Sequence, residues 1–273
     1  MLAPIFLPDE NMSRRPDAPP ASLLPALRTH LWFGGCPVPL QEALVERSRL
    51  IHLSAGEPLR DEAQDGLCCV IAGALRMGSM HPEHGTQRLT LYVEPYHWFG
   101  EVSLIDRIPR IMVAVADTES TVLAVAKSAI EPWLDAHPIY WRDLARLACG
   151  KLRLTTAALE DSASLTLQQR LARRLLFAAV NYGQSAQSGL RRRLRLPQEY
   201  LAQMLGVSRQ TVNKALRDLE KDQVLALHYS EIELLSLEGL LDRAGRLDTQ
   251  LRFMLAGAAP VLLAARSRGT PGG

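Results

Sequence analysis

The residues best suited to chemistry in this sequence lie between Pro197 and Asp222, where they come directly after a turn signal. Ala202 is a small residue where two helices can cross closely, and Gly206 follows four positions later. Glycine tolerates the positive φ angle that a tight turn demands. Ser208 is a good helix N-cap, because its hydroxyl can accept a hydrogen bond from a backbone N–H group. The apolar contacts between the two helices would come from Leu201, Leu205, Val207, Val212 and Ala215. This spacing predicts a helix-turn-helix.

The second helix of this motif would carry side chains that read nucleic acid. Its N-terminal end is the part that enters the major groove of DNA in such motifs. Arg and Lys can bind guanine O6 and N7, and Gln and Asn can bind adenine. The candidate DNA-binding residues are Ser208, Arg209, Gln210, Thr211, Asn213 and Lys214. They predict double-stranded DNA as a partner, since a two-helix scaffold without nucleic acid has no need of these exposed groups.

Charge is unevenly distributed along the 273 residues, whose net charge is only +2. Between Ser164 and Val224 there are eleven Arg and Lys residues but four Asp and Glu residues. Such a local excess predicts contact with phosphates, although the run Arg191 to Arg195 by itself is more often a solvated surface. The next segment, VLALHYSEIELLSL, predicts two short strands around His228, Tyr229 and Ser230. These strands would form a small wing against the DNA backbone.

Residues 31–135 have the pattern of a β domain that could sense a small molecule. Short apolar runs recur between Ile51 and Ala126, separated by glycines and other turn residues. Regular short strands with turn signals between them predict an antiparallel barrel or roll. A short helix is expected before the strands, near Leu40 to Arg49.

Residues 136–163 have the periodicity of one long helix. Small and apolar residues recur at alternating spacings of three and four, which is a heptad-like seam. The seam consists of Ala145, Ala148, Leu152, Thr155, Leu159 and Ser162. It predicts a homodimer paired through this helix, and the alternative is one face of a helix packed on the roll. A second amphipathic helix is expected over Leu165 to Tyr182, within the DNA-binding region 164–240.

Other parts of the chain narrow the class of protein. Residues 1–30 are expected to be a flexible, proline-rich leader, and residues 241–273 a C-terminal tail. There is no signal-peptide pattern and no apolar stretch of the roughly 20 residues that a membrane span needs. The four cysteines lack a C-x-x-C spacing, so we expect reduced, mostly buried thiols, no metal site and a cytoplasmic protein. Common catalytic motifs are absent as well, so no enzyme and no catalytic residue are expected.

The chain resembles the CRP/FNR family, the regulators related to the cyclic-AMP receptor protein. The resemblance runs from about Ile51 to Leu240 and is most specific in WFGEVSLIDRIPR, from Trp98, and LGVSRQTVNKALRDLE, from Leu205. It implies an α+β fold with an N-terminal cyclic-nucleotide-binding-type β-roll, a long dimerisation helix and a C-terminal winged helix-turn-helix. It also implies a homodimer that binds a two-fold symmetric operator and contacts RNA polymerase.

The resemblance assigns base reading mainly to Arg209, Gln210 and Lys214. Family members often carry Glu where this chain has Gln210. Gln keeps an acceptor but adds a donor and loses the charge. The preferred operator is therefore expected to depart from the family's common TGTGA-type half-site at that position.

The resemblance also implies an effector site. The family holds a ribose with a Gly-Glu pair, here Gly100 and Glu101, and a cyclic phosphate with an Arg-Ser pair, here Arg110 and Ile111. The adenine contacts fall on Thr155 and Thr156. Because Ile111 replaces the serine, three interpretations stay open: a cyclic nucleotide such as cAMP, another small effector, or an empty pocket in which Glu101 and Arg110 pair. A nucleotide-binding sensor without DNA binding is a further alternative.

The resemblance to this family raises two other kinds of sensor as alternatives. An iron–sulfur cluster is not expected, because Cys36 is the only cysteine in the N-terminal region. Haem binding stays open, since histidines are present, but no arrangement among them indicates an axial pair.

Overall fold

The computed structural model describes residues 20–60, 65–80, 87–180, 191–229, 231–247 and 252. It divides the chain into two compact units. The first unit contains residues 1–87 and 92–148, and the second contains residues 88–91 and 149–273. Helix α6 (Trp141–Ser164) begins in the first unit and continues into the second.

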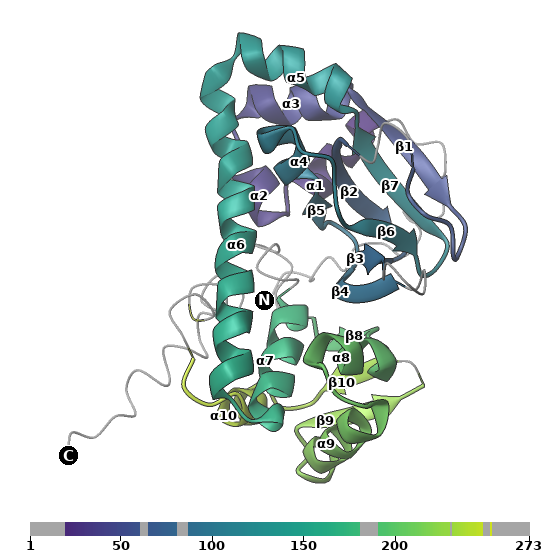
Figure 1. The fold of residues 1–273 in the computed structure, drawn as a ribbon, viewed down its shortest axis with the longest axis vertical. Coiled ribbons are helices and arrows are strands. Elements are labelled where there is room, and N and C mark those ends of the chain that lie inside the picture. The colour runs from purple at the N-terminus through teal and green to yellow at the C-terminus, as the bar shows by residue number, and fades with distance from the viewer. Residues whose placement is uncertain are drawn as a thin grey trace, which may run out of the picture. The chain divides into compact units, whose positions relative to one another are not determined.

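The first unit contains the β-roll and the short helices around it (Figure 1). Its helices and 3-10 turns are η2 (Pro20–Leu23), α1 (Leu24–Leu27), α2 (Leu31–Gly34), α3 (Val38–Glu46), α4 (Glu101–Asp106), α5 (Lys127–Ala136) and η4 (Pro138–Tyr140). Its strands are β1 (Ser48–Leu53), β2 (Leu67–Ala72), β3 (Leu75–Met80), β5 (Trp98–Phe99), β6 (Val113–Ala116) and β7 (Ser120–Val125). Strand β4 (Gln87–Val93) pairs with β3, although its residues 88–91 are grouped with the second unit. The sheets have the strand orders β1-β7-β2-β5 and β4-β3-β6.

Antiparallel pairing holds this roll together, as the sequence predicts. β7 pairs antiparallel with both β1 and β2, and β6 pairs antiparallel with β3. The core beside the larger sheet is aromatic at its centre, where the Phe33 ring stacks on Trp98 with 5.2 Å between ring centroids. Trp32 meets the same indole edge-on at 5.3 Å, and its Nε1 donates to the Asp143 carbonyl at 2.7 Å. α2 is therefore fixed both to the sheet and to the start of α6.

The prediction of a flexible leader over residues 1–30 is wrong for residues 20–30. These residues form η2 and α1, and Leu27 and His30 are buried. The leucines of this segment pack into the same core as α3, which supplies the burial that a proline-rich composition did not reveal. Residues 1–19 lie outside the described part of the chain.

All four cysteines are free thiols, as expected. Cys36, Cys68 and Cys69 are buried and Cys149 is exposed. Burial raises the pKa of the Cys36 thiol to about 12 and that of the Cys69 thiol well above its usual value. These two thiols are therefore protonated at neutral pH.

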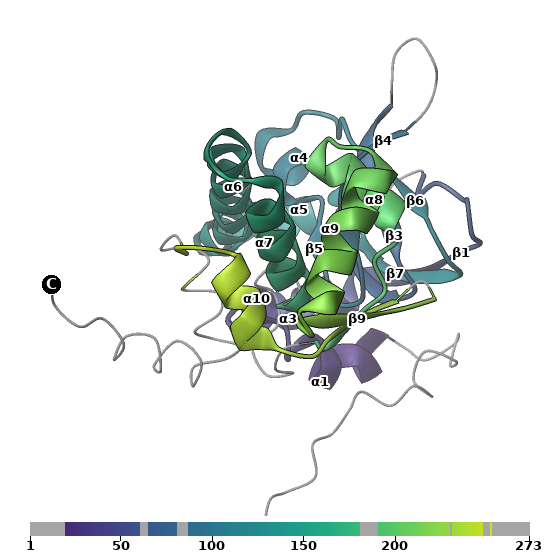
Figure 2. The same cartoon turned by 90° about the horizontal axis from the view of Figure 1, so that it is seen from below.

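The second unit contains the rest of α6 and the segment for which the sequence predicts a helix-turn-helix and a wing. Its further helices are α7 (Leu167–Ala179), α8 (Gln198–Leu205), α9 (Arg209–Lys221) and α10 (Leu237–Arg243). Its short strands β8 (Arg193–Leu194), β9 (Leu225–His228) and β10 (Glu231–Leu234) form an antiparallel sheet in the order β8-β10-β9. Figure 2 shows α9 beside α8, in the arrangement that a helix-turn-helix requires.

The two helices before the motif agree with the expected pattern. The long helix expected over residues 136–163 is observed as α6. α7 begins after Thr166, which forms a capping box with Gln169 and so satisfies N–H groups on both sides of the helix start. None of the described helices combines the length and the apolar character needed to cross a bilayer.

Arg173 joins three segments of the second unit from its position on α7. The side chain is 6% exposed and forms an ion pair with Asp161, in the last turn of α6. Its Nε donates to the Ala244 carbonyl at 3.1 Å, and its Nη2 donates to the Arg246 carbonyl. The expected tail therefore does not begin at residue 241, because α10 continues to Arg243 and the residues after it are held by Arg173.

We predict that Asp161→Ala lowers the free energy of unfolding by roughly 3–5 kcal/mol, because removing one partner of a buried ion pair leaves the other charge uncompensated. Chemical denaturation of the full chain measures this loss. The control is Glu160→Ala, which removes the same charge from an exposed neighbour in α6. Equal stability of the two variants would show that the pair does not hold these segments together.

Candidate nucleic-acid interface and effector pocket

The turn between α8 and α9 has the geometry that the sequence predicts. Gly206 adopts the left-handed conformation, with φ 67° and ψ 34°. The Val207 N–H donates to the Ala202 carbonyl at 3.0 Å, which closes the end of α8. The apolar faces of the two helices are buried, at Leu201, Ala202 and Leu205 on α8 and at Val212, Ala215, Leu216 and Leu219 on α9. This packing fixes which face of α9 is left to solvent.

Ser208 is the N-cap of α9, as expected. Its Oγ accepts from the Thr211 N–H at 3.1 Å and lies 2.8 Å from the Thr211 hydroxyl. The hydroxyl therefore satisfies a backbone donor that would have no partner at the helix start. Its role in this structure is to begin the recognition helix.

Of the other candidate DNA-binding residues, Arg209, Gln210, Thr211 and Lys214 are exposed near the N-terminal end of α9. Asn213 is half-buried and differs from them. Its Nδ2 donates to the Gln198 Oε1 at 2.8 Å, and its Oδ1 accepts from the Arg217 Nε at 3.0 Å. In this geometry the Asn213 amide links α9 to α8, and its contact with DNA stays a prediction. Sequence spacing reveals the position of Asn213 on the helix but not this pairing with Gln198.

The wing after α9 has the predicted two strands. β9 and β10 pair with Glu231 opposite His228, and Tyr229 between them is fully exposed. His228 lies 2.9 Å from the Glu233 carboxylate, and this hydrogen bond, together with Arg193, holds the pKa of Glu233 below its usual range. Ser230 lies outside the described residues.

The basic excess expected for phosphate contact is smaller in the folded unit than in the sequence. Arg173 is buried against Asp161, and Arg170 donates to the Leu205 carbonyl at 3.3 Å. Arg193 lies 3.7 Å from both Glu231 and Glu233. These two acidic residues follow Val224 and so lie outside the segment with the basic excess. Ion pairs therefore neutralise Arg173 and partly neutralise Arg193, whereas Arg170 gains a hydrogen bond but no opposite charge.

In the first unit, Gly100 and Arg110 come together as the family resemblance implies. Gly100 has φ 101°, and a Cβ atom there would lie 2.1 Å from the Gly66 carbonyl oxygen and 2.2 Å from the Arg110 Nη2. Only glycine fits this approach. The Arg110 Nη2 donates to the same carbonyl at 2.7 Å, and its guanidinium carbon lies 5.1 Å from the Phe99 ring centroid. The guanidinium is thereby held at the start of α4.

Two further groups complete the surroundings of Arg110. Glu101, the first residue of α4, is buried. Burial raises the pKa of the Cys68 thiol to about 11, against the opposing effect of the charge and hydrogen bond of Arg110. Cys68 is therefore a neutral thiol beside the guanidinium at neutral pH.

Ile111, which stands where the family has serine, is 81% exposed. The replacement therefore removes a hydroxyl without burying an apolar side chain.

The two threonines expected to contact a base lie on the part of α6 that belongs to the second unit, whereas Gly100, Glu101 and Arg110 belong to the first. Both threonines are exposed. The Thr155 hydroxyl donates to the Lys151 carbonyl and the Thr156 hydroxyl to the Leu152 carbonyl, each at 3.0 Å. Each oxygen keeps acceptor capacity toward a ligand. Among the described residues, no group of His, Cys, Asp and Glu side chains could hold a metal ion.

Known protein families match both the β-roll region and the helix-turn-helix region of the chain. Residues 50–137 match the cyclic nucleotide-binding domain, and residues 169–243 match the Crp-like helix-turn-helix domain. A CRP-like cAMP-activated global transcriptional regulator from Mycobacterium tuberculosis is 30% identical over 204 residues, which cover 74% of this chain and 91% of the relative.

Solved structures share the fold. A CRP/FNR-family transcriptional regulator from Thermus thermophilus has a TM-score of 0.54 and 24% identity, and covers 72% of this chain and 99% of its own. FixK2 from Bradyrhizobium japonicum has a TM-score of 0.62 and 19% identity, and covers 74% of this chain and 99% of its own. At these identities the likeness concerns the fold alone.

Proposed function

The chain belongs to the CRP/FNR family of DNA-binding transcription regulators, and we propose that it binds a two-fold symmetric operator as a homodimer under the control of a small effector. The observation that carries the DNA-binding part is the geometry of α9. Its buried face is fixed against α8, and Arg209, Gln210 and Lys214 are left exposed near its N-terminal end. This is the end that enters the major groove in helix-turn-helix proteins.

We predict that Arg209→Ala weakens binding to the operator by roughly 1–3 kcal/mol and relaxes the preference at one base position, because a bidentate contact with guanine is lost. Fluorescence anisotropy measures the effect on an operator selected in vitro by the full chain and varied base by base. Lys221→Ala is the matched control, because it removes a charge from the other end of the same helix. Unchanged specificity of Arg209→Ala would contradict the assignment of α9 as the recognition helix.

The homodimer is supported by apolar residues left open on α6. Leu152 is 66% exposed and Leu159 is 65% exposed, and they lie seven residues apart on the predicted seam. Two positions a heptad apart share one face of a helix, which a second copy of the same helix can cover. Fully burying one leucine side chain contributes roughly 1.5–3 kcal/mol, so a pair of such helices gains from four of them.

We predict that Leu152→Glu raises the dissociation constant of the dimer at least tenfold, because a charge replaces an apolar group in the seam. Sedimentation equilibrium measures this constant. Arg153→Glu places the same side chain on a neighbouring exposed position outside the seam and serves as the control. If both variants dissociate equally, or neither does, the seam is not the dimer interface.

For the effector we propose a cyclic nucleotide. Gly100 and the Arg110 guanidinium lie close together, and Ile111 is exposed. Arg110 would hold the phosphate, Gly100 and Glu101 the ribose, and Thr155 and Thr156 the base. Binding would change how the two α6 helices pair, since these threonines lie on the same helix as the seam. We further propose that the DNA-bound dimer contacts RNA polymerase.

We predict saturable binding of cAMP or cGMP to the full chain in a calorimetric titration, and at least a tenfold loss of affinity in Arg110→Ala, because the phosphate loses its cation. Since Arg110 also contacts Gly66, the exposed Thr155→Val serves as a second variant and should weaken binding without affecting stability. Absence of heat with either nucleotide would contradict a cyclic-nucleotide effector. It would leave DNA binding intact and favour another effector or none.

A further inference from the structure

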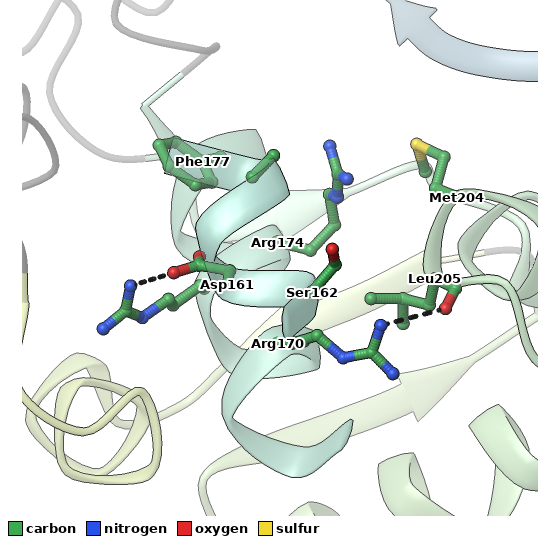
Figure 3. A pocket seen from close by; sticks show the side chains of 9 residues that line it. Asp161, Ser162, Arg170, Arg174, Phe177, Met204 and Leu205 are labelled. Carbon is green, nitrogen blue, oxygen red and sulfur yellow. Dashed lines mark hydrogen bonds and ion pairs between the residues drawn. The ribbon is translucent and has the colours of Figure 1, made fainter. Parts of the chain in front are cut away.

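A small cavity lies in the second unit, where the last turn of α6, helix α7 and the end of α8 meet (Figure 3). Its volume is about 50 Å³. The polar part of its lining comes from Asp161 and Ser162 on α6 and from three arginines of α7, and Met204 and Leu205 contribute from α8. The cavity shares no residue with the effector set Gly100, Glu101 and Arg110, which belongs to the first unit.

The positive charge around this cavity exceeds the negative charge. The Arg173 charge is met by Asp161, and Figure 3 shows the Asp161 carboxylate turned toward that ion pair and away from the other two arginines. Arg170 and Arg174 remain, and within the described part of the chain neither forms a salt bridge. They stand four residues apart on α7, a spacing at which like charges destabilise a helix. An anion between them would remove this repulsion.

The hydrogen bonds of Arg170 leave a donor unused. Its Nη1 donates to the Leu205 carbonyl at 3.3 Å. Its Nε is buried and, among the described residues, has no hydrogen-bond partner. A buried polar group without a partner is rare in folded proteins, because it has given up its hydrogen bonds to water. This N–H group therefore indicates an acceptor that the chain itself does not provide.

The two arginines and Ser162 line the same cavity. In Figure 3, Arg170 and Arg174 extend on either side of Ser162, and both lie on the side of α7 that faces Met204 and Leu205. The Ser162 hydroxyl donates to the Leu159 carbonyl at 2.7 Å and adds a polar wall between the two guanidinium groups. Planar guanidinium groups bind tetrahedral phosphates well, because they offer paired N–H donors.

We propose that this cavity is a binding site for a phosphate group, held by Arg170 and Arg174. The volume of about 50 Å³ exceeds what one water requires, roughly 10–15 Å³, and is far below the roughly 300–1,000 Å³ of pockets for larger ligands. A whole nucleotide is therefore excluded, whereas free inorganic phosphate and a single phosphate of the DNA backbone share the chemistry that fits. Either one would fasten α7 to the helix-turn-helix. The site does not depend on the proposed effector.

The first test is a titration of the full chain with inorganic phosphate at constant ionic strength set by sodium chloride, followed by thermal unfolding and ³¹P NMR. Arg174→Gln is the decisive variant, because among the described residues Arg174 forms no hydrogen bond or ion pair that its loss would break. Arg170→Gln is less clean, since it also removes the contact with Leu205. Arg153→Gln removes an equal charge from an exposed position of α6 and is the control.

The second test measures the salt dependence of binding to the selected operator in chloride buffer. Each neutralised phosphate contributes about 0.9 to the slope of log affinity against log salt concentration. If a DNA phosphate occupies the cavity, the slope falls by about one in Arg174→Gln and stays unchanged in Arg153→Gln.

Two results would support the site. Saturable binding of inorganic phosphate that weakens at least tenfold in Arg174→Gln identifies a free anion, and the change in salt slope identifies the DNA backbone. If Arg174→Gln matches the control in both experiments, the cavity does not bind phosphate. This outcome is distinct from a failure of the DNA-binding proposal, which the base preference of Arg209→Ala tests separately.

Discussion

The DNA-binding unit depends on the burial of one charge, that of Arg173. A guanidinium that is taken out of water must be paired and hydrogen-bonded, and Arg173 meets this demand with Asp161 and with two carbonyl oxygens after α10. Because the three partners come from α6 and from the C-terminal segment, these parts must converge on α7. The requirement of one side chain therefore fixes the end of the long helix beside the helices that carry the recognition motif.

The proposed recognition surface follows from a division of α9 into a buried and an exposed face. Val212, Leu216 and Leu219 are buried, so rotation of the helix would expose apolar surface. Asn213 adds a polar contact to Gln198 that ties the same helix to α8. The exposed set is thus narrower than the polar residues of the helix, and Arg209, Gln210 and Lys214 form its centre.

Arginine serves different purposes in this chain. Asp161 neutralises Arg173, whose charge therefore contributes to structure. The Gly66 carbonyl and the Phe99 ring orient Arg110 without neutralising it. Arg170 and Arg174 line a cavity where they form no salt bridge with the described residues, so their charges are available to a partner.

The sequence by itself determined the features that depend on local physics: the short strands, the long helix, the left-handed turn at Gly206 and the cap at Ser208. Each needs only residues a few positions apart. Tertiary structure decided the burial of Arg173, the pairing of Asn213 with Gln198, the outward direction of Ile111 and the packing of residues 20–30. These outcomes depend on partners far away in the chain, such as Ala244 for Arg173 and α3 for Leu27. A local pattern shows that a side chain is charged or apolar, but only the assembled fold determines whether it meets a partner or solvent.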